Sequence, residues 1–345
     1  MNFSDLPPQP ERGFIASMEQ IAELRLVSLE EGAGRGMRLV QADNGSGLSF
    51  SVCPDRGMDV VDCRFRGIPL AFRTPSGYVA PSHFDPHGLG WLRSWQGGLL
   101  TTSGLRNSGV PNGEFGLHGR ASSLPAEDLS LSRGVDENGS FRMRISGTMR
   151  EAAMFGENLR WRRSIETAYR ENSITVTDRF TNLAPHEEFL QLLYHCNFGW
   201  PFASPALEFV MPPHEVRPRT EKAERNLARW NRLEEPRPDY EEECFFHDLP
   251  ADADGLKRFE LHNRELGIRV AFEYGSAELP ELIEWKNCLT GSYALGIEPA
   301  NVSLEGRNAD MKSGKARRMK PYETVETQLK ISFNNLEGDG MIKEM

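Results

Sequence analysis

The sequence predicts an all-β fold, a large antiparallel sandwich of two packed sheets with few short helices. The 32 glycines and 22 prolines are scattered along the chain, so the segments between them are short. Many of these segments alternate polar with apolar residues, as strands joined by turns do. The sequence has no βαβ alternation and no glycine-rich phosphate-binding motif, so a nucleotide-binding α/β fold is not expected.

The first half of the chain is expected to form two meanders, one of four strands and one of three. In the second meander, Arg170–Ser173 is expected to be a tight hairpin turn because Asn172 tolerates a positive φ. The expected strands are Leu24–Glu30, Gly36–Ala42, Gly47–Cys53, Met58–Phe65, Ser140–Glu151, Leu159–Tyr169 and Ser173–Thr181.

The second half is expected to add further strands and one helix. Thr220–Leu233 has the clearest helical periodicity and ends before Pro236. In contrast, Trp91–Ala126 contains too much glycine for a regular helix or a central strand and is expected to be a long loop. The later strands are Glu188–Phe198, Gly267–Tyr274, Ser292–Glu298 and Thr324–Phe333.

Two of these strands carry polar residues on the face opposite the expected core. Gln191, His195 and Asn197 share one face of Phe189–Trp200, where they could hydrogen-bond the hydroxyls of a polar ligand. On the second strand, Glu298 follows Gly296 and Ala294 on its own face, which leaves room for a bound ring. Pro299 is expected to end that ladder, since it lacks an N–H.

Ordinary structural roles compete with each of these functional interpretations. His195 could be a satisfied histidine at a sheet edge, and Glu298 could be an exposed residue near a strand end. His118 is the most site-like residue of the glycine-rich segment, but it could also be a simple turn histidine.

Four segments resemble a mutarotase-like branch of the aldose 1-epimerase superfamily (domain of unknown function 4432). They are PDRGMDV (54–60), GGLLTTSGL (97–105), GLHGRASSLPA (116–126) and YALGIEPAN (293–301). The resemblance covers about residues 20–333. It therefore favours a single mutarotase-like domain that spans residues 1–345 and has polar terminal tails. It implies a galactose mutarotase-like β-supersandwich, and an isomerase that interconverts sugar anomers without a metal or an organic cofactor.

The resemblance also assigns roles to residues that match the motifs of the family. Glu298 in GIEPAN matches the catalytic carboxylate, and His118 matches the histidine of an HG motif. His195 in HCNFG matches the histidine of an HxYFN-like motif of the family, and this match is partial. Arg93 matches the substrate-binding arginine, with Arg106 as a rival. Asp248 is the candidate for the remaining aspartate of the family.

The chemistry of ring opening suits these side chains. A base must remove the proton of the C1 hydroxyl while an acid protonates the ring oxygen, so we expect Glu298 to act as base and His195 as acid. His118 would hold the ring oxygen or help to protonate it. Trp285 could stack on the apolar face of a sugar, and Trp200 is a second candidate.

Other functions remain open at this stage. The chain could be a non-catalytic carbohydrate-binding or sugar-sensing protein on the same fold, or a lyase or hydrolase with two carboxylates. The substrate could also be an acidic sugar, phosphorylated or sulfonated, because several cations lie near the signature segments. They are Arg56, Arg93, Arg106, Arg120 and Lys286; the alternative is that Arg56 pairs with Asp55 or Asp59 and the others brace loops.

Composition excludes several kinds of partner. The net charge of −10 argues against a nucleic-acid ligand, and no run approaches the ~18 apolar residues of a membrane span. Met1–Arg12 does not resemble a secretory signal, and the five cysteines are far apart, so we expect reduced thiols in a cytoplasmic protein. A metal site at His83 and His87 is not expected, because Pro86 breaks the helix that would align them. The oligomeric state is left open.

Overall fold

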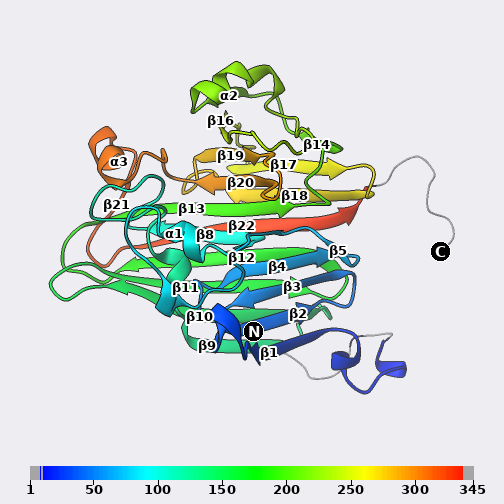
Figure 1. The fold of residues 1–345 in the computed structure, drawn as a ribbon. Coiled ribbons are helices and arrows are strands. Elements are labelled where there is room, and N and C mark those ends of the chain that lie inside the picture. The colour runs from blue at the N-terminus through cyan, green and yellow to red at the C-terminus, as the bar shows by residue number, and fades with distance from the viewer. Residues whose placement is uncertain (1–7, 9–10, 337–345) are drawn as a thin grey trace.

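The computed structural model describes Pro8 and residues 11–336. Its strands form four antiparallel sheets, and three of them are large (Figure 1). The first sheet is a meander of five strands in sequence order, the four predicted strands followed by the short β5. Its strands are β1 (Glu23–Ser28), β2 (Arg38–Asp43), β3 (Leu48–Cys53), β4 (Asp59–Phe65) and β5 (Ile68–Pro69).

The second sheet has eight strands and contains the predicted three-stranded meander at one side. In spatial order it consists of β14 (Leu207–Val210), β17 (Leu256–Asn263), β18 (Ile268–Gly275), β22 (Thr324–Asn335), β12 (Glu171–Asn182), β11 (Asn158–Ala168), β10 (Phe141–Ala152) and β9 (Glu127–Val135).

The third sheet has seven strands and carries the polar strand that the sequence singles out. In spatial order it consists of β15 (Glu215–Pro218), β16 (Glu243–Asp248), β19 (Glu281–Asn287), β20 (Ala294–Ala300), β13 (Glu188–Gly199) and β21 (Arg317–Met319), and β8 (Leu100–Leu105) also pairs with β13. The small fourth sheet joins β6 (Phe72–Arg73) and β7 (Gly97–Gly98). The α-helices are short: α1 (Trp91–Ser94), α2 (Glu221–Arg225) and α3 (Arg307–Ser313).

One hydrophobic cluster joins the three large sheets, so they pack as layers of a single sandwich. Strand β13 shows how its sequence fits this arrangement. Leu190, Leu192, Tyr194, Cys196 and Phe198 alternate into the cluster, which confirms the predicted core face. The other face of β13 is thereby turned away from the core and is available for a site.

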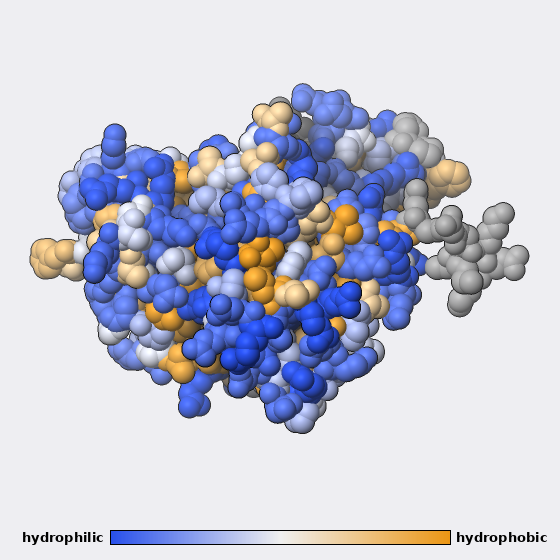
Figure 2. All heavy atoms as spheres, turned by 90° about the horizontal axis from the view of Figure 1, so that it is seen from above, coloured by the Kyte–Doolittle hydropathy of each residue, from blue (hydrophilic) through white to orange (hydrophobic). Residues whose placement is uncertain are grey.

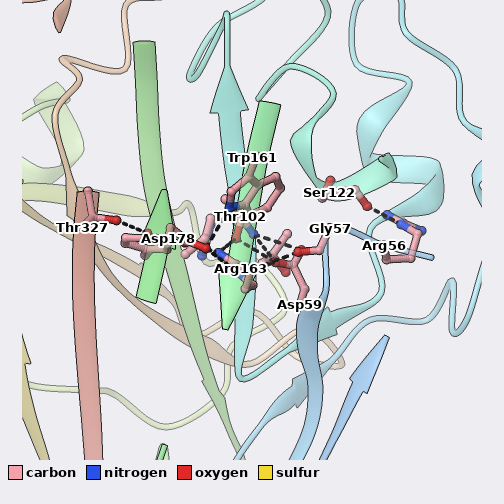
Figure 3. A network of polar contacts seen from close by, with 12 residues as sticks. Arg56, Gly57, Asp59, Thr102, Ser122, Trp161, Arg163, Asp178 and Thr327 are labelled. Atoms are coloured by element: carbon pink, nitrogen blue, oxygen red, sulfur yellow. Dashed lines mark hydrogen bonds and ion pairs between the residues drawn. The ribbon is translucent and has the colours of Figure 1, made fainter. Parts of the chain in front are cut away.

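A buried polar network crosses the sandwich on the core side of β13 (Figure 3). Arg163 is fully buried and contacts Asp59 at 3.0 Å and Asp178 at 2.8 Å. Asp178 also accepts hydrogen bonds from Trp161 and Tyr194, and Thr102 binds Asp59. This network ties strands of all three large sheets together through one guanidinium.

Four local predictions are wrong. The turn between β11 and β12 is at Tyr169–Arg170, with the positive φ at Arg170, and Asn172 already lies in β12. The predicted helix shortens to α2 and a 3-10 turn. The segment expected to be a loop contains α1 and all of β8, and β20 runs past Pro299 to Ala300 because its pairing with β19 continues there.

The surface seen from above is mostly hydrophilic, with hydrophobic residues in small separate groups (Figure 2). Within the described residues, no helix is long and apolar enough to cross a membrane.

Candidate active site

A cavity of about 360 Å³ lies on the outer face of β13 and β20. It brings together His118, His195 and Glu298, the three residues expected to be catalytic, and it also includes Trp285. The remaining lining residues are Leu89, Trp91, Leu92, Trp95, Gly109, Val110, Leu117, Arg219, Glu242, Cys244 and Leu304.

His195 and Glu298 form a close pair at the base of this cavity. Their strands are neighbours, with Cys196 of β13 opposite Ile297 of β20, so the two side chains emerge side by side. His195 Nε2 lies 3.3 Å from Glu298 Oε1, and both side chains are buried. Neither Glu298 Oε1 nor His195 Nδ1 has a hydrogen-bond partner among the described residues. Buried polar atoms of this kind are available to a ligand.

Gly296 makes this pair possible. A Cβ at this position would lie 2.6 Å from Glu298 Oε1 and 3.0 Å from His195 Cε1. The sequence correctly indicates that a small residue is needed on this face. However, the space next to the strand holds the two reactive side chains themselves, whereas the expectation was that it would hold the ring of the ligand.

Burial keeps this pair electrically neutral. Loss of hydration raises the pKa of Glu298 to about 8, with a further contribution from Glu242, while Arg219 opposes the shift. Burial lowers the pKa of His195 well below its usual value. Near pH 7 the carboxyl group therefore holds the proton and the imidazole is unprotonated.

His118 reaches the cavity from a tight turn. Its φ is +57°, and Gly119 follows with a φ of +69°. A Cβ at Gly119 would lie 2.3 Å from the carbonyl oxygen of Asn107, so the HG motif requires glycine here. Burial lowers the pKa of His118 to about 4, which leaves its ring neutral.

Ser103 anchors the ring of His118. The Ser103 hydroxyl lies 3.0 Å from His118 Nδ1, 3.1 Å from the carbonyl oxygen of His118 and 2.7 Å from Ser108 Oγ. A hydroxyl can donate to the ring nitrogen of a neutral histidine or accept from it. Nε2, the other ring nitrogen, is left to hydrogen-bond a ligand hydroxyl in the cavity.

Three tryptophans surround the two histidines. The ring of Trp91 lies 4.7 Å from that of His118, and the rings of Trp95 and Trp285 lie 5.4 and 5.6 Å from that of His195. Trp285 thus takes the position expected of a stacking residue, whereas Trp200 follows the end of β13, is 75% exposed and does not line the cavity. Sequence reasoning did not single out Trp91 and Trp95. The pattern that could have identified them is their i, i+4 spacing, which places two side chains on the same side of a helical turn.

Sequence reasoning missed two charged lining residues, Arg219 and Glu242. Arg219 follows β15 and binds Glu305 at 3.0 Å, and Glu242 precedes β16 and accepts a hydrogen bond from Trp285. Neither belongs to a motif, and Glu242 stands in a run of three glutamates that looks like a solvated surface. Their position depends on how the edge of the seven-stranded sheet folds.

The residues expected to bind substrate, Trp285 apart, lie elsewhere. Arg93 is exposed on α1, and Asp248 is exposed at the end of β16; neither lines the cavity. Arg106 pairs with Glu157 and Glu188. Gln191 donates to Asp310 and accepts from Ser108, while Asn197 donates to two carbonyl groups. These last three side chains brace loops and strands.

The other cations near the signature segments do not line the cavity either. Arg56 is buried and donates to the carbonyl groups of Ser122, Val79 and Ser94, so it pairs with neither Asp55 nor Asp59. Lys286 pairs with Glu243 at 3.0 Å, and Arg120 is exposed. Among the described residues, no group of three or more His, Cys, Asp or Glu side chains is placed to hold a metal ion.

Comparison with known proteins identifies the family of this chain. A family model described as domain of unknown function (DUF4432) matches residues 34–333. Comparison with the curated proteins finds no match. A solved structure described as a candidate aldose 1-epimerase from Klebsiella pneumoniae subsp. pneumoniae MGH 78578 has a TM-score of 0.87 and 22% identity, covering 92% of this chain and 87% of that chain.

Two further solved structures share the fold. A galactose mutarotase-like protein from Clostridium acetobutylicum has a TM-score of 0.64 at 13% identity, covering 92% of this chain and 99% of its own. A galactose 1-epimerase from Lactobacillus acidophilus NCFM has a TM-score of 0.60 at 12% identity, covering 91% and 99%. The expected galactose mutarotase-like β-supersandwich is confirmed.

Proposed function

The chain belongs to the DUF4432 family, and we propose that it is an aldose 1-epimerase-like isomerase that interconverts the anomers of a free sugar. The observation that carries this proposal is the buried pair of His195 and Glu298, 3.3 Å apart in one cavity. Opening a hemiacetal requires one proton to leave O1 and one to reach O5. Two adjacent groups, one protonated and the other able to accept a proton, meet both needs.

The pKa directions assign the starting roles. Because Glu298 begins protonated and His195 begins neutral, Glu298 donates to the ring oxygen while His195 accepts the proton of the C1 hydroxyl. This order reverses the roles expected from the sequence. The C1–O5 bond breaks, and the open-chain aldehyde remains in the cavity with a carboxylate beside an imidazolium.

Ring closure restores both groups. Rotation about the C1–C2 bond presents the other face of the aldehyde to the O5 hydroxyl. O5 attacks C1, its proton returns to Glu298, and His195 protonates the former carbonyl oxygen. Each side chain acts once as acid and once as base, so no net proton is gained or lost. General acid and base groups contribute about 10²–10⁴-fold each, enough for a reaction that already proceeds slowly in water.

The surrounding residues bind and orient the sugar. His118 hydrogen-bonds a ring hydroxyl through Nε2, and the Trp95 and Trp285 rings pack against the apolar face of the pyranose. A cavity of about 360 Å³ is at the small end of ligand sites, which suits a monosaccharide.

Anomer exchange measured by saturation-transfer NMR over a panel of sugars tests this function. Glu298→Gln is expected to lower the enzyme-dependent rate by at least about 100-fold. Glu326→Gln is the control, since Glu326 lies on β22 of the eight-stranded sheet and pairs with Arg179. An unchanged rate in Glu298→Gln would refute the assignment. Binding of a sugar by the wild-type chain without any exchange would identify a carbohydrate-binding protein.

A further inference from the structure

Arg56 belongs to the PDRGMDV segment, which the proposed function does not use. Its side chain is only 1% exposed, and its guanidinium binds backbone carbonyl groups of three separate segments. Nε donates to Ser122 (Figure 3), and Nη1 donates to Val79 at 2.7 Å and to Ser94 at 2.9 Å. A buried guanidinium is costly, so its contact with three segments at once indicates that Arg56 holds them in place.

Two of these carbonyl groups belong to short segments beside the cavity. Ser94 is the last residue of α1, and Ser122 lies in the 3-10 turn η5 (Ala121–Ser123). Because α1 has only four residues, it is not stable by itself, and its position depends on contacts with the rest of the protein. The hydrogen bond from Arg56 supplies one such contact at its C-terminal end.

Gly57, the next residue of the segment, brings η5 close. Its N–H donates to the carbonyl oxygen of Leu124 at 2.8 Å, and its φ is +60°. A Cβ at this position would lie 2.8 Å from the carbonyl oxygen of Ala121. Glycine is therefore required here, and residues 56 and 57 together fix η5 against the turn between β3 and β4.

Ser122 connects this anchor to a tryptophan of the cavity. The indole N–H of Trp91 donates to Ser122 Oγ at 3.1 Å, and the backbone of Ser122 is held by Arg56. Trp91 in turn stacks on Trp95, with ring centroids 4.9 Å apart and an angle of 23° between the rings. Arg56 thus reaches the stacked pair at two points, through Ser122 and through Ser94.

The two tryptophans form the wall beside the two histidines of the cavity. The ring of Trp91 lies 4.7 Å from that of His118, and the ring of Trp95 lies 5.4 Å from that of His195. Both tryptophans are buried and line the cavity. Because protein interiors are closely packed, a shift of this wall would change the orientation of both imidazole rings.

We propose that Arg56 is a positioning residue for the acid–base reaction, which holds the Trp91–Trp95 pair against the two histidines without touching the sugar. The proposal rests on the proposed function, because it assumes that the histidines act on a sugar. It gives the PDRGMDV segment a role in catalysis. The competing explanation is that Arg56 only stabilises the fold, and the following variants separate the two roles.

Ser122→Ala removes one link between Arg56 and the wall. The Trp91 indole loses its acceptor, and kcat for anomer exchange of the best substrate is expected to fall by about tenfold. Ser123→Ala is the matched control, because Ser123 is also buried in η5 and its Oγ has no hydrogen-bond partner among the described residues. Its kcat should equal that of the wild type.

Two variants change Arg56 itself. Arg56→Met removes all donors, and Arg56→Lys keeps the charge but replaces the planar fork with a single ammonium group. We expect kcat to fall by about 100-fold in Arg56→Met and by a smaller factor in Arg56→Lys. Arg307→Lys is the control, because Arg307 is buried on α3 and also donates to two carbonyl groups, but it does not line the cavity.

Circular dichroism reports on the tryptophan pair without any sugar. Two stacked indole rings couple their electronic transitions and give neighbouring bands of opposite sign, and Trp91→Phe identifies the bands that arise from this pair. These bands should weaken in Ser122→Ala and disappear in Arg56→Met. They should persist in Ser123→Ala and Arg307→Lys. Urea denaturation measures the folded fraction of each variant.

The outcomes separate positioning from folding. A wild-type kcat in Arg56→Met, a lower kcat with unchanged bands, or loss of the bands with an unchanged kcat would each overturn the proposal. A kcat that falls only in proportion to the unfolded fraction would show a purely structural role. If Arg56→Met does not fold, Arg56→Lys and Ser122→Ala decide by the same measurements.

The bands also separate this proposal from the proposed function. If the wild-type chain exchanges no sugar, the isomerase function fails, and the role of Arg56 in catalysis fails with it. The bands of the same variants would still show whether Arg56 holds the tryptophans in place.

Discussion

Gly296→Ala is a severe test of the site because it adds one methyl group between the two reactive side chains. The new Cβ would lie 2.6 Å from Glu298 Oε1 and 3.0 Å from His195 Cε1. To restore an ordinary contact distance, the carboxyl group must withdraw by roughly 0.5–1 Å. A displacement of this size at reacting groups costs about 100-fold in rate.

The stability of this variant should change much less. Gly296 lies within β20 and its φ is not positive, so alanine introduces no backbone strain. Stiffening the unfolded chain contributes about 0.4–1 kcal/mol, which offsets part of an overpacking cost of about 1–3 kcal/mol. We therefore expect a free energy of unfolding within about 2 kcal/mol of the wild type, measured by urea denaturation.

The assay is polarimetric anomerisation of the best substrate, with urea denaturation in parallel. Gly275→Ala is the control, because its Cβ would meet only Glu278 Oε2 at 3.8 Å, an ordinary contact. A wild-type rate in Gly296→Ala would refute the reasoning, because the crowded pair could then not be the reacting pair. Loss of activity together with loss of folding would point to a structural role for Gly296.

Three further results are expected. The kcat/KM should fall as pH rises from about 7 through about 8, because deprotonated Glu298 cannot donate to the ring oxygen; a rate that rises across this range would contradict the assignment. Ser103→Ala should lower the rate on the order of tenfold because His118 loses the hydroxyl that positions its ring, and it should lower the free energy of unfolding in urea by about 1–3 kcal/mol because buried groups lose a hydrogen-bond partner. Arg163→Met should lower the free energy of unfolding by about 3–5 kcal/mol, because two buried carboxylates lose their cation; a loss below about 1 kcal/mol would show that the network is dispensable.

The sequence predicts those parts of the fold that local patterns control. The alternation along β13 separates Tyr194, which enters the core, from His195, which faces the cavity. Strand β8 escapes prediction because its glycine, Gly104, marks a close approach to the carbonyl oxygen of Gln191 in β13, and such an approach depends on a partner far away in the chain.

The residues of the candidate site also fall into two groups, those that local motifs predict and those that depend on distant parts of the chain. His118 and Glu298 stand in motifs whose local geometry needs glycine, so the sequence itself marks them. Arg219 and Glu242 enter the cavity only because β16 pairs with β19 and β15 pairs with β16 at the edge of the seven-stranded sheet, and no local pattern predicts these pairings. Arg93 illustrates the opposite error, since it lies in a promising segment but is exposed on α1, away from the cavity.

The cavity is built from two kinds of backbone. Its reactive pair stands on adjacent paired strands in the middle of a sheet, whereas Leu89 and Leu92 stand on a short helix and the loop before it. The two leucines can therefore be changed without moving the paired strands that hold His195 and Glu298. Polar substitutions at these two positions should change which sugars are accepted and leave the proton chemistry intact.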